Sequence, residues 1–331
     1  MSRRLLALVL LGVACGATMP VHAYLKYGVR VGERTVHVRW AAGTVRYFVT
    51  ERGGPGVSPS ELEGAVSRAF ASWAAVPTAS IAPQYLGLTI QPPGAADGRS
   101  TIGFLDRPDL DRTLGATSFL LDADTGEILE SDIFFNTAFD WSAAAAGDAG
   151  RVDLESVALH EIGHLLGLGH SAIGETELLP SGNRRVIAAG AVMFPIAFSA
   201  GSIAGRTLQP DDIAGISDLY PAAGFRDRTG SISGTVTRGG AGLFGAHVLA
   251  INARTGALVS AFTLDGQGRF VIGGLDPGPH IVRVEPLDDA DAESFFTGAI
   301  ETDFAVTYAR GLVVAPRGGT SDPVAIQVTA R

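Results

Sequence analysis

Apolar residues follow two different periods along this chain, and the first of them is helical. Behind a Ser-Pro-Ser-Glu sequence that starts at Ser58, large apolar residues recur at intervals of three or four, namely at Leu62, Val66, Phe70 and Trp73. Residues with this spacing lie on one face of a helix. Ser58 and Glu61 have the form of a capping box, and proline suits the first helical position. The pattern therefore predicts a helix that begins at Pro59 and packs this stripe into a core.

Strands are expected on both sides of that helix, where apolar and polar residues alternate. Residues 34–50 predict two strands around an Ala-Ala-Gly turn, and residues 81–105 predict a strand, a loop and a second strand. Residues 117–121 and 128–135 flank the sequence Asp-Ala-Asp-Thr-Gly at 122–126, which is typical of a hairpin turn. The first half of the chain therefore mixes helices with strands.

Two more helices are predicted further along. The longest candidate spans residues 152–166, with Asp153 as its N-cap. Another is expected at 210–220, where Asp211 and Asp212 lie in the first turn. The helix dipole favours acidic side chains at that end.

From Ser231 onward the pattern is that of an all-β domain. The segments SISGTVT, AHVLAIN, LVSAFTL, RFVIGGL and HIVRVEP alternate and are separated by Gly/Asp turns. We therefore expect an α+β domain followed by a β-sandwich. The predicted parts are a leader at 1–23, the α+β domain at 24–222, a linker at 223–229 and the sandwich at 230–331. We expect residues 24 to about 222 to fold and function without the sandwich.

The first residues have the composition of an export signal. Arginines at 3 and 4 precede an uninterrupted apolar run at 5–13, and Val21-His22-Ala23 places small residues before a cleavage site. We expect cleavage after Ala23, which removes Cys15, the one cysteine of the chain. The protein is then secreted or periplasmic. The alternative is a lipoprotein anchored at Cys15.

Composition narrows the classes of protein that fit. The chain has 331 residues, of which 46% are hydrophobic and 18% charged, as in a globular protein of about two domains. No apolar stretch reaches the ~18 residues of a membrane-spanning helix. The formal net charge of −9 argues against a nucleic-acid partner, since phosphate-binding surfaces are basic. We expect a monomer.

The strongest chemical signal is the sequence HEIGHLLGLGH, which begins at His160. His160 and His164 are four residues apart, so on a helix they project from one face and are able to bind one zinc ion. Glu161 lies beside the first ligand and is expected to act on a water molecule rather than on the metal. Gly167 is expected to end the helix and turn the chain back, which makes His170 the third ligand. Three protein ligands leave one position open, as in a catalytic zinc site.

Other interpretations of these residues are weaker. A lone histidine on an apolar helix is more often a core residue than a ligand, but here three of the seven histidines fall within eleven residues. A chance match to the five fixed positions is on the order of 10⁻⁵ per chain at this composition. The carboxylates of Asp122 and Asp124 are of a type that binds Ca²⁺, but a hairpin turn explains them and nothing else supports calcium.

The chain resembles a known family, the metzincin zinc proteases, and among them the matrixins. HEIGHLLGLGHS is followed by Ala-Val-Met-Phe-Pro at 191–195 and by LQPDDIAGISDLY at 208–220. It is preceded by SDIFFN at 131–136, which resembles the strand before the zinc helix of that family. The resemblance covers roughly residues 36–220.

The resemblance implies a fold and several roles. The fold is a metzincin-type twisted mixed sheet over two helices, with Met193 in the Met-turn beneath the zinc. Residues 115–120 are the sheet edge along which an extended peptide binds. Pro195 and Phe198 wall the specificity pocket, which favours an apolar residue just after the scissile bond.

The sequence also departs from that family. No histidine lies between His37 and His160, so the second, structural zinc site of many matrixins is missing. Without Cys15 the mature chain has no thiol for cysteine-based latency. Residues 171–190 are longer than the usual link to the Met-turn and are expected to form an extra loop near the cleft.

Together these features predict a secreted zinc-dependent endopeptidase, which hydrolyses peptide bonds through a zinc-activated water with Glu161 as general base. The C-terminal part resembles the carboxypeptidase-regulatory-like β-sandwich module and has no catalytic cluster of its own. One alternative is an inert metzincin scaffold that serves as a secreted binding or adhesion protein. Another is a zinc amidase that acts on a non-peptide amide. Neither alternative is favoured, because no ligand is lost and the Met-turn sequence is present.

Overall fold

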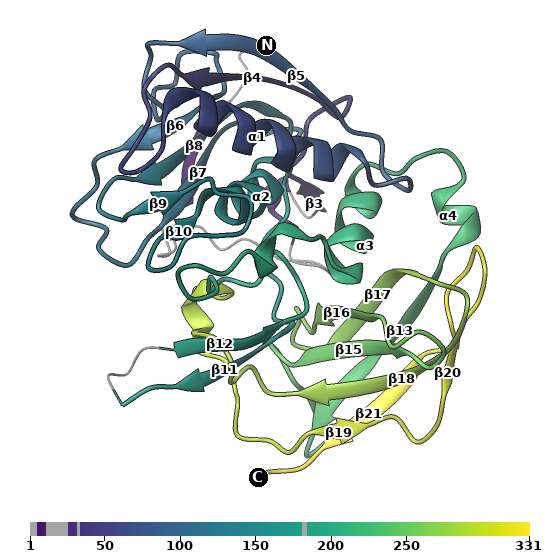
Figure 1. Ribbon diagram of the computed structural model, residues 1–331. Coiled ribbons are helices and arrows are strands. Elements are labelled where there is room, and N and C mark those ends of the chain that lie inside the picture. Colours follow the sequence, from purple (N-terminus) through teal and green to yellow (C-terminus); the bar gives the residue numbers. More distant parts are fainter. Residues whose placement is uncertain (1–4, 11–25, 32–33, 181–183) are drawn as a thin grey trace. The chain divides into compact units, whose positions relative to one another are not determined.

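The structure is a computed structural model that describes residues 5–10, 26–31, 34–180 and 184–331 (Figure 1). Packing divides the chain into two compact units. The first is built mainly from Val29–Gly167 and Ala197–Leu208, and the second mainly from Leu168–Ile196 and Gln209–Arg331. Helices and mixed sheets occur in the first, and the second is rich in strands, so the expected α+β class is confirmed.

The first unit is organised around one sheet with the strand order β1-β7-β8-β6-β4-β5. Its strands are β1 Leu5–Leu10, β4 Thr44–Thr50, β5 Ala82–Thr89, β6 Thr101–Leu105, β7 Gly115–Asp122 and β8 Ile128–Asn136. Strand β7 is antiparallel to both β8 and β1, whereas β4, β5, β6 and β8 pair in parallel. The short pairs are β2 Gly28–Val31 with β3 Arg34–His37, and β9 Trp141–Ser142 with β10 Val152–Asp153. The expected strands and the 122–126 hairpin turn are confirmed.

Two helices pack on this sheet and on each other. Helix α1 spans Pro59–Ala74, starts with the predicted Ser58–Glu61 capping box and buries the predicted stripe. Helix α2 spans Leu154–Leu165. The indole N–H of Trp73 donates to the carbonyl of Leu159 at 2.9 Å, which ties the end of α1 to the middle of α2. These contacts fix α2, which carries most of the histidine motif.

The start of α2 is secured by a buried ion pair. Asp153 is the predicted N-cap, and its Oδ2 accepts hydrogen bonds from the backbone N–H of Ser156 at 2.9 Å and from Nε of Arg206 at 2.9 Å. Arg206, in the 3₁₀ turn η1 Ala204–Arg206, also donates to the carbonyl of Ala144 at 2.8 Å. Both side chains are largely buried, at 3% and 15% exposure.

Replacing this cap should destabilise the protein strongly. Asp153→Ala removes the closest carboxylate from the buried guanidinium of Arg206 and leaves Glu155, at 3.8 Å, as its remaining ion-pair partner, a change that costs about 3–5 kcal/mol in the free energy of unfolding. Asp153→Asn keeps an oxygen for the cap and should cost less. The exposed pair of Asp148 with Arg151 provides the control, since Asp148→Ala should change stability by no more than ~1 kcal/mol. Denaturant unfolding of the three variants measures this, and equal stabilities would contradict it.

The second unit begins with a hairpin and two helices. Strand β11 Gly174–Leu178 pairs antiparallel with β12 Arg184–Ala189, so much of the segment 171–190, expected as a loop, is paired as strands. Strand β11 is mostly polar and β12 has two arginines followed by four apolar residues, so neither strand shows the alternation that marks a half-buried strand. Helix α3 Pro210–Leu219 is confirmed, and α4 Phe225–Arg228 lies within the expected linker.

A β-sandwich completes the second unit. One sheet contains β13 Gly230–Arg238, β14 Ala241–Gly242, β17 Arg269–Leu275 and β21 Val324–Val328. The other contains β15 His247–Asn252, β16 Leu258–Phe262, β18 Gly278–Glu285, β19 Thr307–Tyr308 and β20 Val313–Ala315. A 3₁₀ turn, η2 Ala292–Ser294, follows β18.

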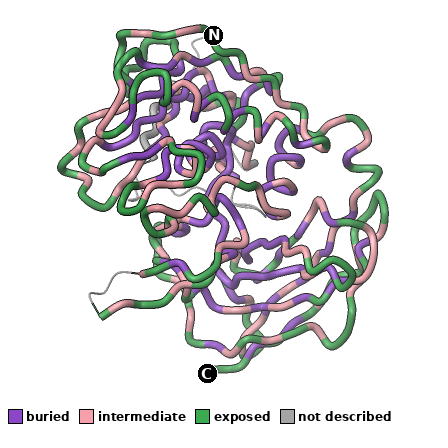
Figure 2. The backbone as a smooth tube through the Cα atoms, viewed as in Figure 1, coloured by how far each residue is buried: buried purple, intermediate pink, exposed green. Residues whose placement is uncertain are grey.

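The core of the sandwich is contributed by both sheets (Figure 2). Its largest fully buried side chain is Phe304, and Ile232, Val236, Ile272 and Val282 are equally inaccessible. Ala214 of α3 belongs to the same cluster, so α3 packs on the sandwich. The boundary expected near residue 222 stays a prediction, but α3 shares its core with the strands that follow it.

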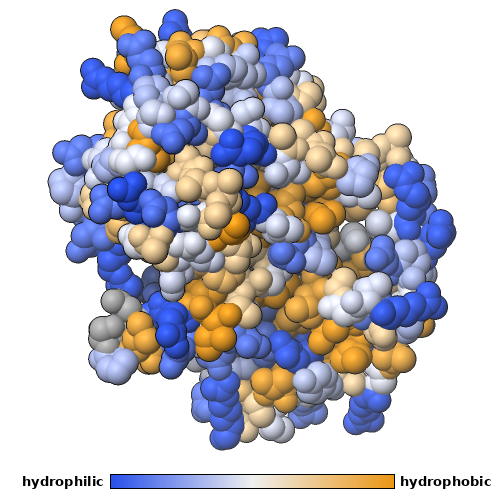
Figure 3. Space-filling model, in the orientation of Figure 1, coloured by the Kyte–Doolittle hydropathy of each residue, from blue (hydrophilic) through white to orange (hydrophobic). Residues whose placement is uncertain are grey.

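Hydrophobic and hydrophilic residues are interspersed over the face shown in Figure 3, with hydrophilic side chains along much of its periphery. Large exposed apolar side chains include Leu86, Leu88 and Ile90 at and just after β5. In the described part of the chain, no helix is both long and apolar enough to cross a membrane. Cys15 and the expected cleavage site after Ala23 lie outside the described residues, so export stays a prediction.

Candidate metal centre

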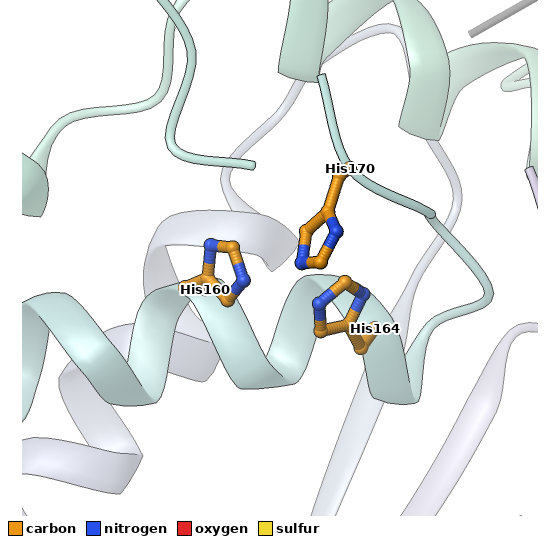
Figure 4. Close-up of side chains that lie close together, drawn as sticks. All are labelled: His160, His164 and His170. Atoms are coloured by element: carbon orange, nitrogen blue, oxygen red, sulfur yellow. The ribbon is translucent and has the colours of Figure 1, made fainter. Parts of the chain in front are cut away.

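Helix α2 presents two histidines on the same face (Figure 4). His160 and His164 are one helical turn apart, and their ring centroids are 4.7 Å apart with the rings at 90°. His164 is buried and His160 is partly exposed. The helix therefore holds both imidazoles side by side before any ligand is considered.

The chain reverses at Gly167 and brings in the third histidine. Gly167 has φ +99°, in the left-handed region where a side chain would be strained, and its N–H donates to the carbonyl of His164. His170 follows three residues later and points back towards the two helical histidines (Figure 4). One ring nitrogen from each of His160, His164 and His170 lies within 4.8 Å of the others.

This set of donors fits zinc. Imidazole nitrogens are common zinc ligands, and a set of three leaves one position of a four-coordinate ion open. Desolvation of the imidazole by the surrounding protein lowers the pKa of His170, and the hydrogen bond with the carbonyl of Ser294 raises it in part. A lowered pKa keeps the imidazole neutral, which is the form that binds a metal.

Glu161 lies next to the first histidine and is buried. The hydroxyl of Thr117, on β7, donates to Oε2 of Glu161 at 2.7 Å. Burial raises the pKa of Glu161 to about 7, and the bond from Thr117 opposes part of that rise. Gly115 makes room for this carboxylate, because a Cβ there would lie 3.3 Å from Oε1 of Glu161 and 3.0 Å from a backbone oxygen. A carboxylate with a raised pKa is well matched to proton transfer near neutral pH.

Met193 lies in a buried turn that touches the segment of the third histidine. Its carbonyl accepts a hydrogen bond from the N–H of Ser171 at 2.8 Å, and the hydroxyl of Ser171 donates to Asp211 at 2.6 Å. His170 and Met193 both line a small pocket whose other walls include Asp211 and Asp212. The predicted Met-turn residue is therefore in direct contact with the backbone that follows His170.

Asp212 holds that turn in place. Its carboxylate accepts the backbone N–H groups of Val192 at 2.8 Å, Met193 at 3.1 Å and Gln209 at 2.8 Å. Burial raises the pKa of Asp212 to about 7, and these three bonds work against the rise. The sequence predicted only a favourable interaction with the helix dipole at this position. The sequence did not show that Asp212 holds the turn, because its bond to Val192 joins residues 20 positions apart.

The remaining predicted residues are Pro195, Phe198, Asp122 and Asp124. Pro195 and Phe198 are partly buried. Oδ1 of Asp122 accepts the N–H groups of Asp124 at 3.0 Å and Thr125 at 3.2 Å, as expected for a turn. The roles of these residues in specificity and in calcium binding stay predictions.

The chain also has relatives among known proteins. The profile of the matrixin family, peptidase family M10, matches residues 39–221, which is more than half of the 331 residues. A helix with two histidines, an adjacent glutamate and a third histidine after a glycine turn is the site of the metzincin class of zinc proteins. This chain belongs to the matrixin family.

Three similar proteins come from Arabidopsis thaliana. Metalloendoproteinase 2-MMP is 30% identical over 229 residues, which are 64% of this chain and 47% of the relative. Metalloendoproteinase 4-MMP is 32% identical over 139 residues, or 40% of this chain and 37% of the relative. Metalloendoproteinase 5-MMP is 49% identical over 69 residues, or 21% and 14%. The chain thus spans less than half the length of these relatives.

Proposed function

We propose that this protein is a zinc-dependent endopeptidase that hydrolyses internal peptide bonds of proteins or peptides. The observation that carries the proposal is the cluster of His160, His164 and His170 with the buried carboxylate of Glu161 beside it. Membership of the matrixin family and likeness to proteins named metalloendoproteinases support the same activity.

The chain's own groups supply the proton transfers. A zinc ion held by the three histidines would polarise the scissile carbonyl and make an attacking water more acidic. Glu161 takes a proton from that water on Oε1 or Oε2 and then delivers it to the leaving amine. Thr117 keeps the carboxylate in place through its bond to Oε2. Met193 and Asp212 maintain the turn against which the segment of His170 rests.

An extended peptide binds along β7 in this proposal. Thr117 of β7 contacts Glu161, so a chain paired with this strand passes the catalytic carboxylate. The outer side of β7 already accepts an antiparallel strand, since β1 pairs with it from Leu5 opposite Asp122 to Leu10 opposite Thr117. Backbone hydrogen bonds of this kind give affinity without demanding a particular sequence. Cleavage of the predicted leader after Ala23 would leave β7 as a free edge for substrate.

The proposal also includes export, the specificity pocket, the oligomeric state and the metal content. The protein is exported through a leader at residues 1–23 and is secreted or periplasmic. Pro195 and Phe198 wall the pocket for an apolar residue after the scissile bond. The enzyme is a monomer with one catalytic zinc, and a calcium site has no support beyond the turn carboxylates.

A peptide library tests the activity and separates it from both alternatives. The purified protein should cut internal bonds of unstructured peptides, lose this activity in a zinc chelator and regain it when zinc returns. Mass spectrometry of the products locates the bonds. Binding of peptides without cleavage would favour an inert scaffold. Cleavage of small non-peptide amides alone would favour an amidase.

A further inference from the structure

The third histidine is oriented by a residue far along the chain. Nδ1 of His170 lies 2.8 Å from the carbonyl oxygen of Ser294, a residue 124 positions later. A carbonyl oxygen only accepts hydrogen bonds, so Nδ1 carries the proton and donates it. Nε2 of His170 then keeps its lone pair for a metal. Such outer-shell partners fix the tautomer and ring orientation of zinc-binding histidines.

Ser294 is kept beside His170 because the next residue packs on the sandwich. The ring of Phe295, the next residue, lies 6.0 Å from the ring of His170 in an edge-on arrangement. The other side of Phe295 packs on Phe262 of β16, at 5.5 Å between ring centroids. Phe295 is only 9% exposed, so it is fixed between the histidine and a strand of the sandwich.

The hairpin β11–β12 also contacts the segment that leads to Ser294. The N–H of Thr176 donates to Oδ1 of Asp289 at 3.2 Å, and its hydroxyl donates to the carbonyl of Asp289 at 2.7 Å. Arg184 of β12 forms an ion pair with Asp291 at 3.5 Å, immediately before η2. The extra hairpin thus braces the approach to Ser294.

A separate link joins the sandwich to the residue after His170. Oδ1 of Asp211 accepts the backbone N–H of Ser260, on β16, at 2.7 Å. Oδ2 of the same carboxylate accepts the hydroxyl of Ser171 at 2.6 Å. Residues 170 and 171 are therefore each tied to the C-terminal part of the chain through their side chains.

We propose that Ser294 and Phe295 are positioning residues for the metal centre, and that the C-terminal sandwich is a working part of the zinc site. The carbonyl of Ser294 sets the tautomer of His170. The ring of Phe295 keeps that carbonyl and the imidazole of His170 in position. This inference rests on the proposed zinc site. It argues against the expectation that residues 24 to about 222 work alone, because such a chain lacks the acceptor for Nδ1 of His170.

Two neighbouring phenylalanines allow a matched test in the full-length protein. Phe296 is as buried as Phe295, at 9% exposure, and also packs on Phe262, at 5.1 Å. Its other ring partners are Phe244 at 5.5 Å and Phe295 itself at 6.5 Å. Phe295→Ala and Phe296→Ala therefore remove similar packing, but only the first removes the ring that touches His170.

The measurement is zinc affinity by chelator competition, with the visible spectrum of the Co²⁺-loaded protein as a second readout. Phe295→Ala should weaken zinc binding by about 10–100-fold and change the Co²⁺ spectrum. Phe296→Ala should leave zinc affinity and spectrum unchanged although its unfolding midpoint falls. Phe295→Leu, which keeps apolar bulk, should fold even where the alanine variant does not, and should show a smaller loss of affinity.

Equal zinc affinities of the Phe295 and Phe296 variants would overturn the inference, as would unchanged affinity in both Phe295 variants. Failure of the proposed function has a different signature. In that case the unaltered protein, with zinc bound, would cleave no peptide, whatever the affinities of the variants.

Discussion

Glu161→Gln is expected to retain zinc and lose nearly all turnover. Glutamine has the shape of glutamate but cannot accept a proton from the attacking water, so kcat should fall by about 10²- to 10⁴-fold. The three histidines are untouched, and the amide can still accept the bond that Thr117 donates to Oε2. Peptide cleavage rates and metal content, measured on the same preparation, check both halves of this prediction.

Glu155→Gln is the matched control for that variant. Glu155 lies in the first turn of the same helix and pairs with Arg68 at 2.7 Å and with Arg206 at 3.8 Å, and it lies outside the histidine cluster. Its substitution should leave kcat near that of the unaltered protein. A Glu161→Gln enzyme that turns over as fast as the Glu155 variant would show that another group acts as the base.

His164→Ala is expected to abolish stoichiometric zinc binding and, with it, peptide cleavage. The variant leaves only two of the three clustered nitrogens. Loss of a direct ligand should weaken zinc binding by more than the about 10–100-fold typical of outer-shell changes. Metal analysis after gel filtration measures the stoichiometry.

His280→Ala serves as its control, because His280 is also a buried histidine. Nδ1 of His280 lies 3.0 Å from the carbonyl of Gly278 in the sandwich, and His280 lies outside the histidine cluster. This variant should lose stability and keep one zinc per chain. Full zinc content in His164→Ala would refute the assigned ligand set.

The ligand set could be predicted from the sequence because it is local. All three histidines fall within eleven consecutive residues, and helical geometry with one glycine turn is enough to bring them together. The helices were predictable for the same reason, since capping residues such as Ser58 and Asp153 lie beside the turns that they cap. Local signals of this kind depend on neighbours that the sequence shows directly.

The supports of the site could not be predicted, because they come from distant parts of the chain. Thr117 meets Glu161 across 44 positions, and Ser294 meets His170 across 124. A threonine within an alternating strand carries no mark of such a role, and the carbonyl of Ser294 is a backbone atom that every residue has. Only the packed fold brings these groups to the motif.

Contacts between the C-terminal part and the segment of His170 could not be predicted for a related reason. A change from mixed to alternating patterning near residue 222 marks a change of secondary structure, but it does not reveal shared packing. Ala214 lies in the sandwich core, and Asp211 bonds to both Ser171 and Ser260. Tertiary contacts thus cross a boundary that the sequence pattern draws.

The most direct test of the whole account is a zinc titration of the metal-free protein during peptide cleavage. Activity should rise in proportion to added zinc, reach its plateau at one zinc per chain and stay about 10²- to 10⁴-fold lower for Glu161→Gln at the same metal content. Full cleavage activity in the metal-free protein, or a protein that binds one zinc at the three histidines and cleaves no peptide, would contradict the assignment of this site.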